Sequence, residues 1–75
     1  MKNTQWVYDR LTELFPRAHV EVLDTRGDDQ HLSLLIKDDV FQGKTLVQRH
    51  QLVYRSLDNL RGGQIHALSI EAKPE

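Results

Sequence analysis

The chain contains no cysteine, and this absence constrains how so short a protein can be stable. Domains below about 80 residues often rely on disulfides or on a metal ion held by thiolates. A chain of 75 residues without cysteine has neither means. At this length a fold buries roughly 60% of the surface that its unfolded chain exposes. We therefore expect residues 1–75 to form one domain, held together by its hydrophobic core or by a partner.

The composition is that of a soluble globular domain, with 39% apolar and 28% charged residues. The formal net charge is −1, which argues against binding of polyanions over the whole surface but allows a local basic patch. The N-terminus lacks the apolar segment of a secretory signal, and no apolar run is long enough to cross a membrane. We therefore expect a cytoplasmic protein with no membrane partner.

The first half of the sequence predicts a helix followed by a β-hairpin. Pro16 ends the helix, because proline disfavours helical geometry in the residue before it. Alternating apolar residues predict strands over residues 19–24 and 31–37, and the polar stretch 25–30 predicts the turn between them. The helix, residues 4–15, repeats its apolar positions every three or four residues: Thr4, Val7, Tyr8, Leu11, Leu14 and Phe15. The strand residues expected to face the core are Val20, Val22, Leu32, Leu34 and Ile36.

The second half predicts a turn, a longer helix and a third strand. Thr45 and Gln48 have the spacing of a capping box, which predicts the start of the helix after the turn at residues 41–44. Gly62 and Gly63 predict its end. The expected buried face of this helix consists of Leu46, Val47, His50, Val53, Tyr54, Leu57 and Leu60. The third strand is expected over residues 64–72, with one face formed by His66, Leu68, Ile70 and Ala72.

The order helix, strand, strand, helix, strand predicts a single αββαβ domain of the α/β (α+β) class. A helix between two strands is the usual connection of parallel neighbours, and such crossovers are right-handed. We therefore expect a three-stranded mixed sheet with both helices on one face. Parallel strands begin at the same edge of a sheet. Because His31 opens the second strand and His66 nearly opens the third, the two histidines are expected to be close in space.

The histidines are the residues most suited to chemistry in this chain. No nucleophile–base arrangement is recognisable, and a chain this short has few residues to line a cleft that excludes water. We therefore expect no enzymatic activity. His66 lies near a strand end beside apolar residues, where a ring is either structural or a metal ligand or switch. His50, inside the apolar face of the long helix, favours a partly buried structural role. His19 is expected to be solvated.

Positive charge gathers on the outer side of the long helix and on the turn before it. Lys44, Arg49 and Arg55 lie there, with few acidic neighbours in the sequence. Such a run fits an ordinary solvated helix face, but it also fits a surface for nucleic acid or for an acidic protein.

Several of these residues together resemble the BolA family. The likeness extends from the first helix to Pro74. In its short loop between the first two strands, the chain resembles the compact bacterial IbaG-like members. The residues that carry it are Val20-Glu21-Val22, His31-Leu32, Phe41-x-Gly43-Lys44, Val47-x-Arg49-His50-x-x-Val53-Tyr54-x-x-Leu57 and Ile65-His66-Ala67-Leu68-x-Ile70.

This resemblance implies a class II KH-like fold and a partnership with monothiol glutaredoxins of the C-G-F-S type. It also implies a [2Fe–2S] cluster that is shared between the two proteins, with thiolates from the glutaredoxin and glutathione and histidine from the BolA-like chain. His66 matches the C-terminal histidine ligand of the family. Many members supply a second ligand from a Cys or His in the loop before the second strand. Residues 25–30 contain neither, so His31 is the nearest residue for that role.

Three functions are compatible with the sequence. The first is a non-enzymatic adaptor in iron–sulfur trafficking or iron sensing, which carries no cluster alone and acts as a monomer or weak homodimer until it meets its glutaredoxin. The second is a DNA-binding transcription regulator that uses Lys44, Arg49 and Arg55. The third is a protein-interaction module that works without a cluster.

Overall fold

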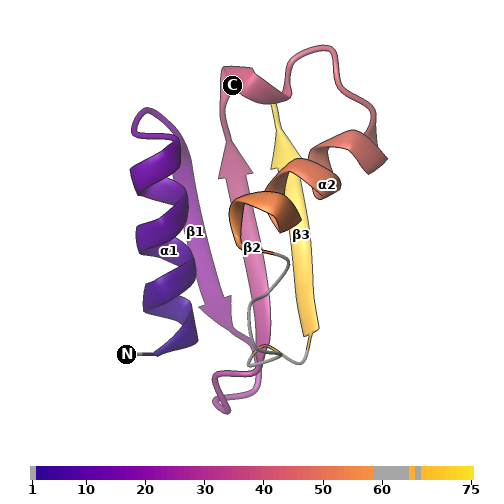
Figure 1. The fold of residues 1–75 in the computed structure, drawn as a ribbon. Coiled ribbons are helices and arrows are strands. Elements are labelled where there is room, and N and C mark those ends of the chain that lie inside the picture. The colour runs from indigo at the N-terminus through magenta and orange to yellow at the C-terminus, as the bar shows by residue number, and fades with distance from the viewer. Residues whose placement is uncertain (1, 59–64, 66) are drawn as a thin grey trace.

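The computed structural model describes residues 2–58, 65 and 67–75, and confirms the predicted order of helices and strands (Figure 1). The elements are α1 (Asn3–Leu14), β1 (His19–Asp24), β2 (His31–Lys37), the 3-10 helix η1 (Asp39–Phe41), α2 (Leu46–Ser56) and β3 (Ala67–Lys73). The short helix η1 is an addition to the prediction, which had only a turn at this place.

The three strands form one mixed sheet in the order β1-β2-β3. Strand β2 pairs antiparallel with β1, so that Val22 lies opposite Leu34. It pairs parallel with β3, so that Leu34 also lies beside Ile70. The predicted hairpin and the predicted parallel crossover through α2 are therefore both confirmed.

The hydrophobic core lies on one face of this sheet. Leu32, Leu34 and Ile36 of the central strand are buried. They belong to the same cluster as Val7 and Leu11 of α1, Val53 of α2 and Leu57 at the C-cap of α2. The opposite face presents the exposed side chains Glu21, Leu23, Ser69 and Glu71. The helices thus cover one face, α1 over β1 and α2 over β3 (Figure 1), and the other face is open.

Helix α1 ends where proline predicted it to end. The backbone N–H of Phe15 donates to the carbonyl of Leu11 at 2.8 Å, and Pro16 follows. The buried stripe is narrower than predicted, because Tyr8 and Leu14 are exposed while only Val7 and Leu11 are fully buried. A helix on the edge strand of a small sheet buries only the residues that point directly at it.

Helix α2 begins with the predicted capping box. The Thr45 hydroxyl accepts a hydrogen bond from the backbone N–H of Gln48 at 3.2 Å, and the Gln48 side chain accepts one from the N–H of Thr45 at 3.0 Å. Leu46 and Val47 were predicted to be buried, and this was wrong: both are exposed. The first turn of α2 lies beyond β3, so no strand lies beneath it (Figure 1).

The end of α2 also differs from the prediction. The helix ends at Ser56 rather than near Leu60, with Leu57 as its C-cap and Asp58 in the left-handed region at φ 52°. Aspartate tolerates this conformation, which stops a helix much as glycine does. Leu60 and the predicted stop at Gly62 and Gly63 lie outside the described residues.

Strand β3 begins three residues later than predicted, at Ala67. Ile65 is buried but lies outside the strand. Leu68, Ile70 and Ala72 pack on the core, as their alternation predicted. Among the residues that the structure describes, no helix is long and apolar enough to cross a membrane.

Candidate functional site

The loop between β1 and β2 is built around aspartate side chains. The Asp24 carboxylate accepts hydrogen bonds from the backbone N–H groups of Gly27 at 2.8 Å and Asp29 at 2.9 Å. Gly27 and Asp29 both have positive φ, which turns the chain back within a few residues. The last residue of β1 therefore closes the loop before β2 begins.

Asp29 fastens this loop to helix α1. Its carboxylate accepts hydrogen bonds from the backbone N–H of Asn3 at 2.6 Å and of Thr4 at 3.2 Å. The Asn3 side chain donates in return to the carbonyl of Asp29 at 2.8 Å. The residue at the helix cap, Lys2, supplies no side-chain bond of its own. A carboxylate at a helix N-terminus satisfies unpaired N–H groups and suits the helix dipole, so the loop and the helix hold each other in place.

His31 stands at the end of this loop and is paired with Asp28. Its Nδ1 atom lies 2.8 Å from Oδ2 of Asp28, and its side chain is 20% exposed. The other oxygen, Oδ1, accepts the backbone N–H groups of Gln30 at 3.0 Å and His31 at 3.2 Å. The bond from Gln30, followed by the bond from the His31 ring, lowers the pKa of the Asp28 carboxyl. Asp28 is therefore an ionised acceptor at neutral pH.

This pairing decides which nitrogen of a neutral His31 ring carries the proton. A carboxylate only accepts hydrogen bonds, so the facing Nδ1 atom must be the donor. The lone pair then lies on Nε2. Metal-ligating histidines usually donate their other ring N–H to a carboxylate or carbonyl in this way. The geometry of His31 therefore fits a ligand that binds metal through Nε2.

The starts of β2 and β3 lie side by side, as predicted. His31 is the register partner of Ala67, and the N–H of Ala67 donates to the carbonyl of Gln30 at 3.0 Å. His66 directly precedes Ala67 in the sequence but lies outside the described residues. The shared edge is thus confirmed, and the closeness of the two histidine rings stays a prediction.

The described residues do not form a metal site by themselves. Within residues 2–58, 65 and 67–75, no three His, Asp or Glu side chains are grouped so that they could hold a metal ion. Each iron of a [2Fe–2S] cluster has two protein ligands besides the bridging sulfides, four in all for the cluster. A cluster bound at His31 would therefore need most of its ligands from elsewhere.

The remaining two histidines lie where the sequence predicted. His19 has a 53% exposed side chain and pairs with Glu21 on the open face of the sheet. It is the register partner of Lys37, the last residue of β2, and so lies at the far end of the strand from His31. His50 is partly buried in α2, and its Nε2 atom is buried without a hydrogen-bond partner.

The three predicted basic residues divide into two groups. Lys44 and Arg55 line one cavity of about 400 Å³, together with Gln42, Gly43, Gln48, Gln51 and Leu52. Arg49 is used differently, since its guanidinium donates to the carbonyls of Lys44 at 3.1 Å and Ala72 at 3.3 Å. Arg49 therefore connects α2 to the preceding turn and to β3, while Lys44 and Arg55 share a polar hollow.

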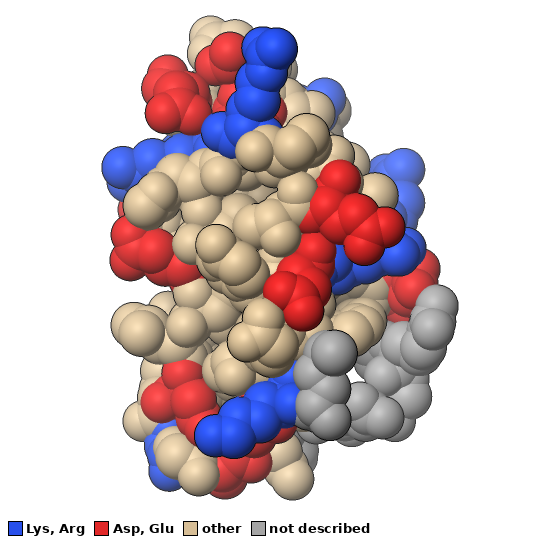
Figure 2. Space-filling view, turned by 90° about the vertical axis from the view of Figure 1, so that its left-hand side faces the viewer, with Lys and Arg blue, Asp and Glu red and all other residues tan. Residues whose placement is uncertain are grey.

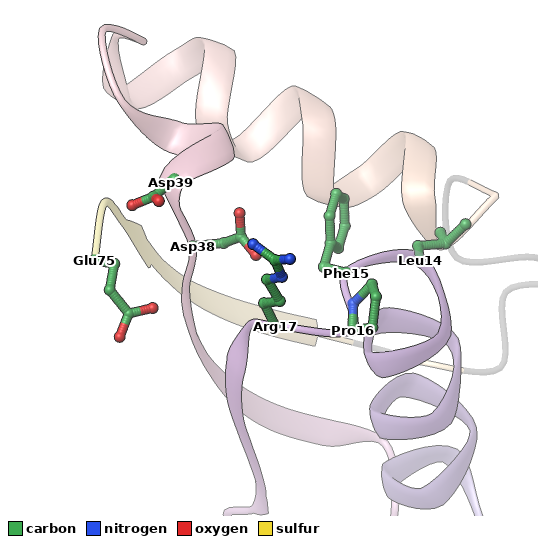
Figure 3. Close-up of a pocket in the computed structure, with 7 residues that line it drawn as sticks. All are labelled: Leu14, Phe15, Pro16, Arg17, Asp38, Asp39 and Glu75. Carbon is green, nitrogen blue, oxygen red and sulfur yellow. The ribbon is translucent and has the colours of Figure 1, made fainter.

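A second cavity, of about 330 Å³, lies between the end of α1 and the start of η1 (Figure 3). Its apolar wall consists of Leu14, Phe15 and Pro16, and its polar rim of Arg17, Asp38, Asp39 and Glu75. The Arg17 side chain extends toward Asp38 (Figure 3). Asp38 also caps η1 by accepting the N–H of Val40 at 2.8 Å.

The surface that includes α1 carries charges of both signs. Figure 2 shows acidic and basic side chains interspersed around an uncharged centre, with no continuous area of one sign. This distribution agrees with the net charge of −1 and offers no extended track for a polyanion on this face.

Comparison with models of known protein families identifies the family of this chain. The family described as BolA-like protein matches residues 11–75, which is most of the sequence. The chain belongs to the BolA family. The resemblance seen in the sequence is therefore confirmed, and with it the expected small α+β fold.

Relatives within the BolA family support this assignment. The chain is 52% identical over 59 residues to SufE-like protein 1 of Arabidopsis thaliana, which covers 75% of this chain and 16% of that relative. The solved BolA domain of SufE1 from Arabidopsis thaliana superposes with a TM-score of 0.83 at 39% identity, covering 99% of this chain and 93% of the domain. BolA1 from the same plant superposes with a TM-score of 0.85 at 27% identity, again over 99% and 93%.

Proposed function

We propose that this BolA-family domain is a non-enzymatic adaptor that binds a monothiol glutaredoxin of the C-G-F-S type and shares a [2Fe–2S] cluster with it. In this role it would serve iron–sulfur trafficking or iron and redox sensing. The observation that carries the proposal is the His31 ring, held by Asp28 in the form that leaves the lone pair on Nε2. It stands at the shared start of β2 and β3, directly beside the residue that follows His66.

The composition of the chain supports a divided site. A chain without cysteine has no thiolate to offer, so its contribution to a cluster is limited to histidine and carboxylate groups. When bound, the cluster supplies an iron that accepts histidine nitrogen in place of thiolate. His66 and His31 would be the ligands from this chain. The thiolates would come from the glutaredoxin and from glutathione.

The proposal is tested by titrating the purified chain into a cluster-loaded C-G-F-S glutaredoxin in the presence of glutathione. We expect the visible absorption and circular dichroism of the cluster to change and to reach an end point at one chain per glutaredoxin. Calorimetry of the same mixture measures binding independently of the cluster. Binding without a spectral change would contradict the shared cluster and indicate a cluster-independent interaction module. Absence of both signals would contradict the partnership itself.

A second function, DNA binding in transcription regulation, is favoured by the cavity that Lys44 and Arg55 share. Two cations that face one hollow can contact neighbouring phosphates. If both do so, the logarithm of the association constant should fall with the logarithm of salt concentration with a slope of about −1.8. Lys44→Ala and Arg55→Ala should each reduce this slope by about 1. Arg26→Ala, an exposed arginine in the loop between β1 and β2, is the matched control and should leave the slope unchanged. No measurable binding at low salt would remove this function.

A further inference from the structure

We infer that Asp28 is a positioning residue, which fixes the proton and the orientation of the His31 ring so that Nε2 binds metal. This inference rests on the proposed function, because it concerns how the chain presents one of its two histidine ligands. Its first consequence, the position of the proton on His31, is nevertheless a property of the chain alone.

The first argument is that the Asp28 carboxylate has little freedom to move. Its Oδ1 atom is held by two backbone N–H groups, those of Gln30 and His31. Only Oδ2 is directed at the ring, at 2.8 Å from Nδ1. The peptide segment that carries both residues is in turn closed by Asp24 and fastened to α1 by Asp29. The carboxylate and the ring therefore meet in one geometry rather than as two mobile side chains.

The second argument is a comparison with the other histidine–carboxylate pair of the described chain. His19 and Glu21 are neighbours on a strand, and their side chains are 53% and 55% exposed. No described backbone group orients the Glu21 carboxylate. Pairs between exposed side chains are worth little and are readily exchanged with water. The His31 ring, at 20% exposure, is much less open to water than the His19 ring.

The third argument concerns the side chains that the loop between β1 and β2 provides. Residues 25–30 contain neither cysteine nor histidine and so offer no ligand of the usual kind. They provide a carboxylate instead, and the ring that this carboxylate orients stands at the first position of the following strand. In this inference Asp28 is the orienting group and His31 is the ligand. A carboxylate partner also raises the basicity of a histidine ligand, and its loss typically costs 10–100-fold in metal affinity.

The decisive variant is Asp28→Asn, because asparagine has the same shape but a different hydrogen-bond capacity. Its carbonyl oxygen can keep the two backbone bonds made by Oδ1, which places its NH₂ group opposite Nδ1 of His31. An NH₂ group donates, so Nδ1 must then accept and the proton must move to Nε2. The same exchange at the aspartate of a serine-protease triad leaves the geometry intact but produces the wrong tautomer. Asp28→Ala removes the carboxylate and with it the preference that hydrogen-bond acceptance by Oδ2 gives to a proton on Nδ1.

The experiment measures the ¹⁵N chemical shifts of the His31 ring in the apo-chain at a pH of about 8, above the ordinary range of histidine titration. We expect a proton on Nδ1 in the wild type, on Nε2 in Asp28→Asn, and a smaller population with the proton on Nδ1 in Asp28→Ala. Glu21→Gln is the matched control and should leave the His31 shifts unchanged. In the glutaredoxin complex, Asp28→Asn should weaken cluster retention by about 10–100-fold. Unchanged amide shifts in α1 and β2 would show that the variants are folded.

Each outcome separates the inference from the function on which it rests. A wild-type ring with its proton on Nε2, or an Asp28→Asn ring that keeps it on Nδ1, overturns the inference whatever the cluster does. An inverted tautomer with undiminished cluster retention overturns it as well, because the proton would then not control the ligand. If the wild-type chain forms no cluster complex but shows the expected tautomers, the proposed function fails while the orientation of His31 by Asp28 is upheld.

Discussion

Replacing His66 by alanine is expected to abolish the change that the chain causes in the spectrum of a cluster-loaded glutaredoxin. Because the chain has no cysteine and the loop 25–30 has no histidine, few side chains are available to replace a lost ligand. An iron without its histidine ligand would bind water or glutathione instead, and the cluster shared by the two proteins would not form. Visible circular dichroism of the titration measures this loss directly, and calorimetry shows whether the two proteins still bind.

The matched control for this variant is His19→Ala. His19 lies at the other end of the sheet from the start of β2, since its register partner is Lys37. Its removal should leave both the spectrum and the end point of the titration unchanged. His31→Ala should weaken cluster retention and alter the spectrum, because a second ligand changes while His66 remains. A His66→Ala chain that gives the wild-type spectrum with wild-type affinity would show that the assignment of the ligand is wrong.

The fold could be predicted from the sequence because its elements carry strong local signals. Pro16 fixes the end of α1, and the Thr45–Gln48 capping box fixes the start of α2. The alternation of Leu32, Leu34 and Ile36 identifies the face of β2 that packs on the helices. Once these elements were in order, the preference for right-handed parallel crossovers left few topologies to consider.

The errors occurred where burial depends on what lies beneath a residue. Leu46 and Val47 follow the helical spacing of Val53, but they lie on a turn that extends past β3 and so stay exposed. Phe41 shows the opposite case. It follows Val40 in a short segment with no periodic pattern, yet it is fully buried and its ring lies 6.5 Å from that of Phe15. Periodicity describes the direction of a side chain along one element and not the neighbours that other elements supply.

The candidate site was predictable only in part, for a similar reason. Parallel pairing placed the starts of β2 and β3 together, which is a consequence of topology alone. The role of Asp28 was not predicted, because the polar stretch 25–30 indicates only a turn. The available signal was a carboxylate three positions before His31 within a tight turn, a spacing that lets one side chain bond both ring and backbone. Asp29 caps α1 from a distant part of the sequence, so no local sequence pattern predicts this contact.

Leu34→Ala is expected to destabilise the domain far more than any change on the open face of the sheet. Leu34 is 1% exposed on the central strand, between Val22 and Ile70. Removing a buried leucine side chain to alanine costs about 2–5 kcal/mol, because transfer energy is lost and a cavity remains. A chain of this size has a total free energy of unfolding of roughly 4–11 kcal/mol. Urea unfolding followed by circular dichroism should therefore show a much lower midpoint.

Leu23→Ala is the control, because it tests whether the loss of stability depends on the face of the sheet. Leu23 lies on β1 but is 63% exposed on the opposite face, so Leu23→Ala should change the free energy of unfolding by less than about 0.5 kcal/mol. Side chains alternate between faces along a strand, and a shift of one residue exchanges the faces completely. Equal losses at the two positions, or a larger loss at Leu23, would therefore contradict the strand register and not merely the size of the effect. His31 and Asp28 would then be placed wrongly as well, because the same register sets the start of β2 beside the start of β3.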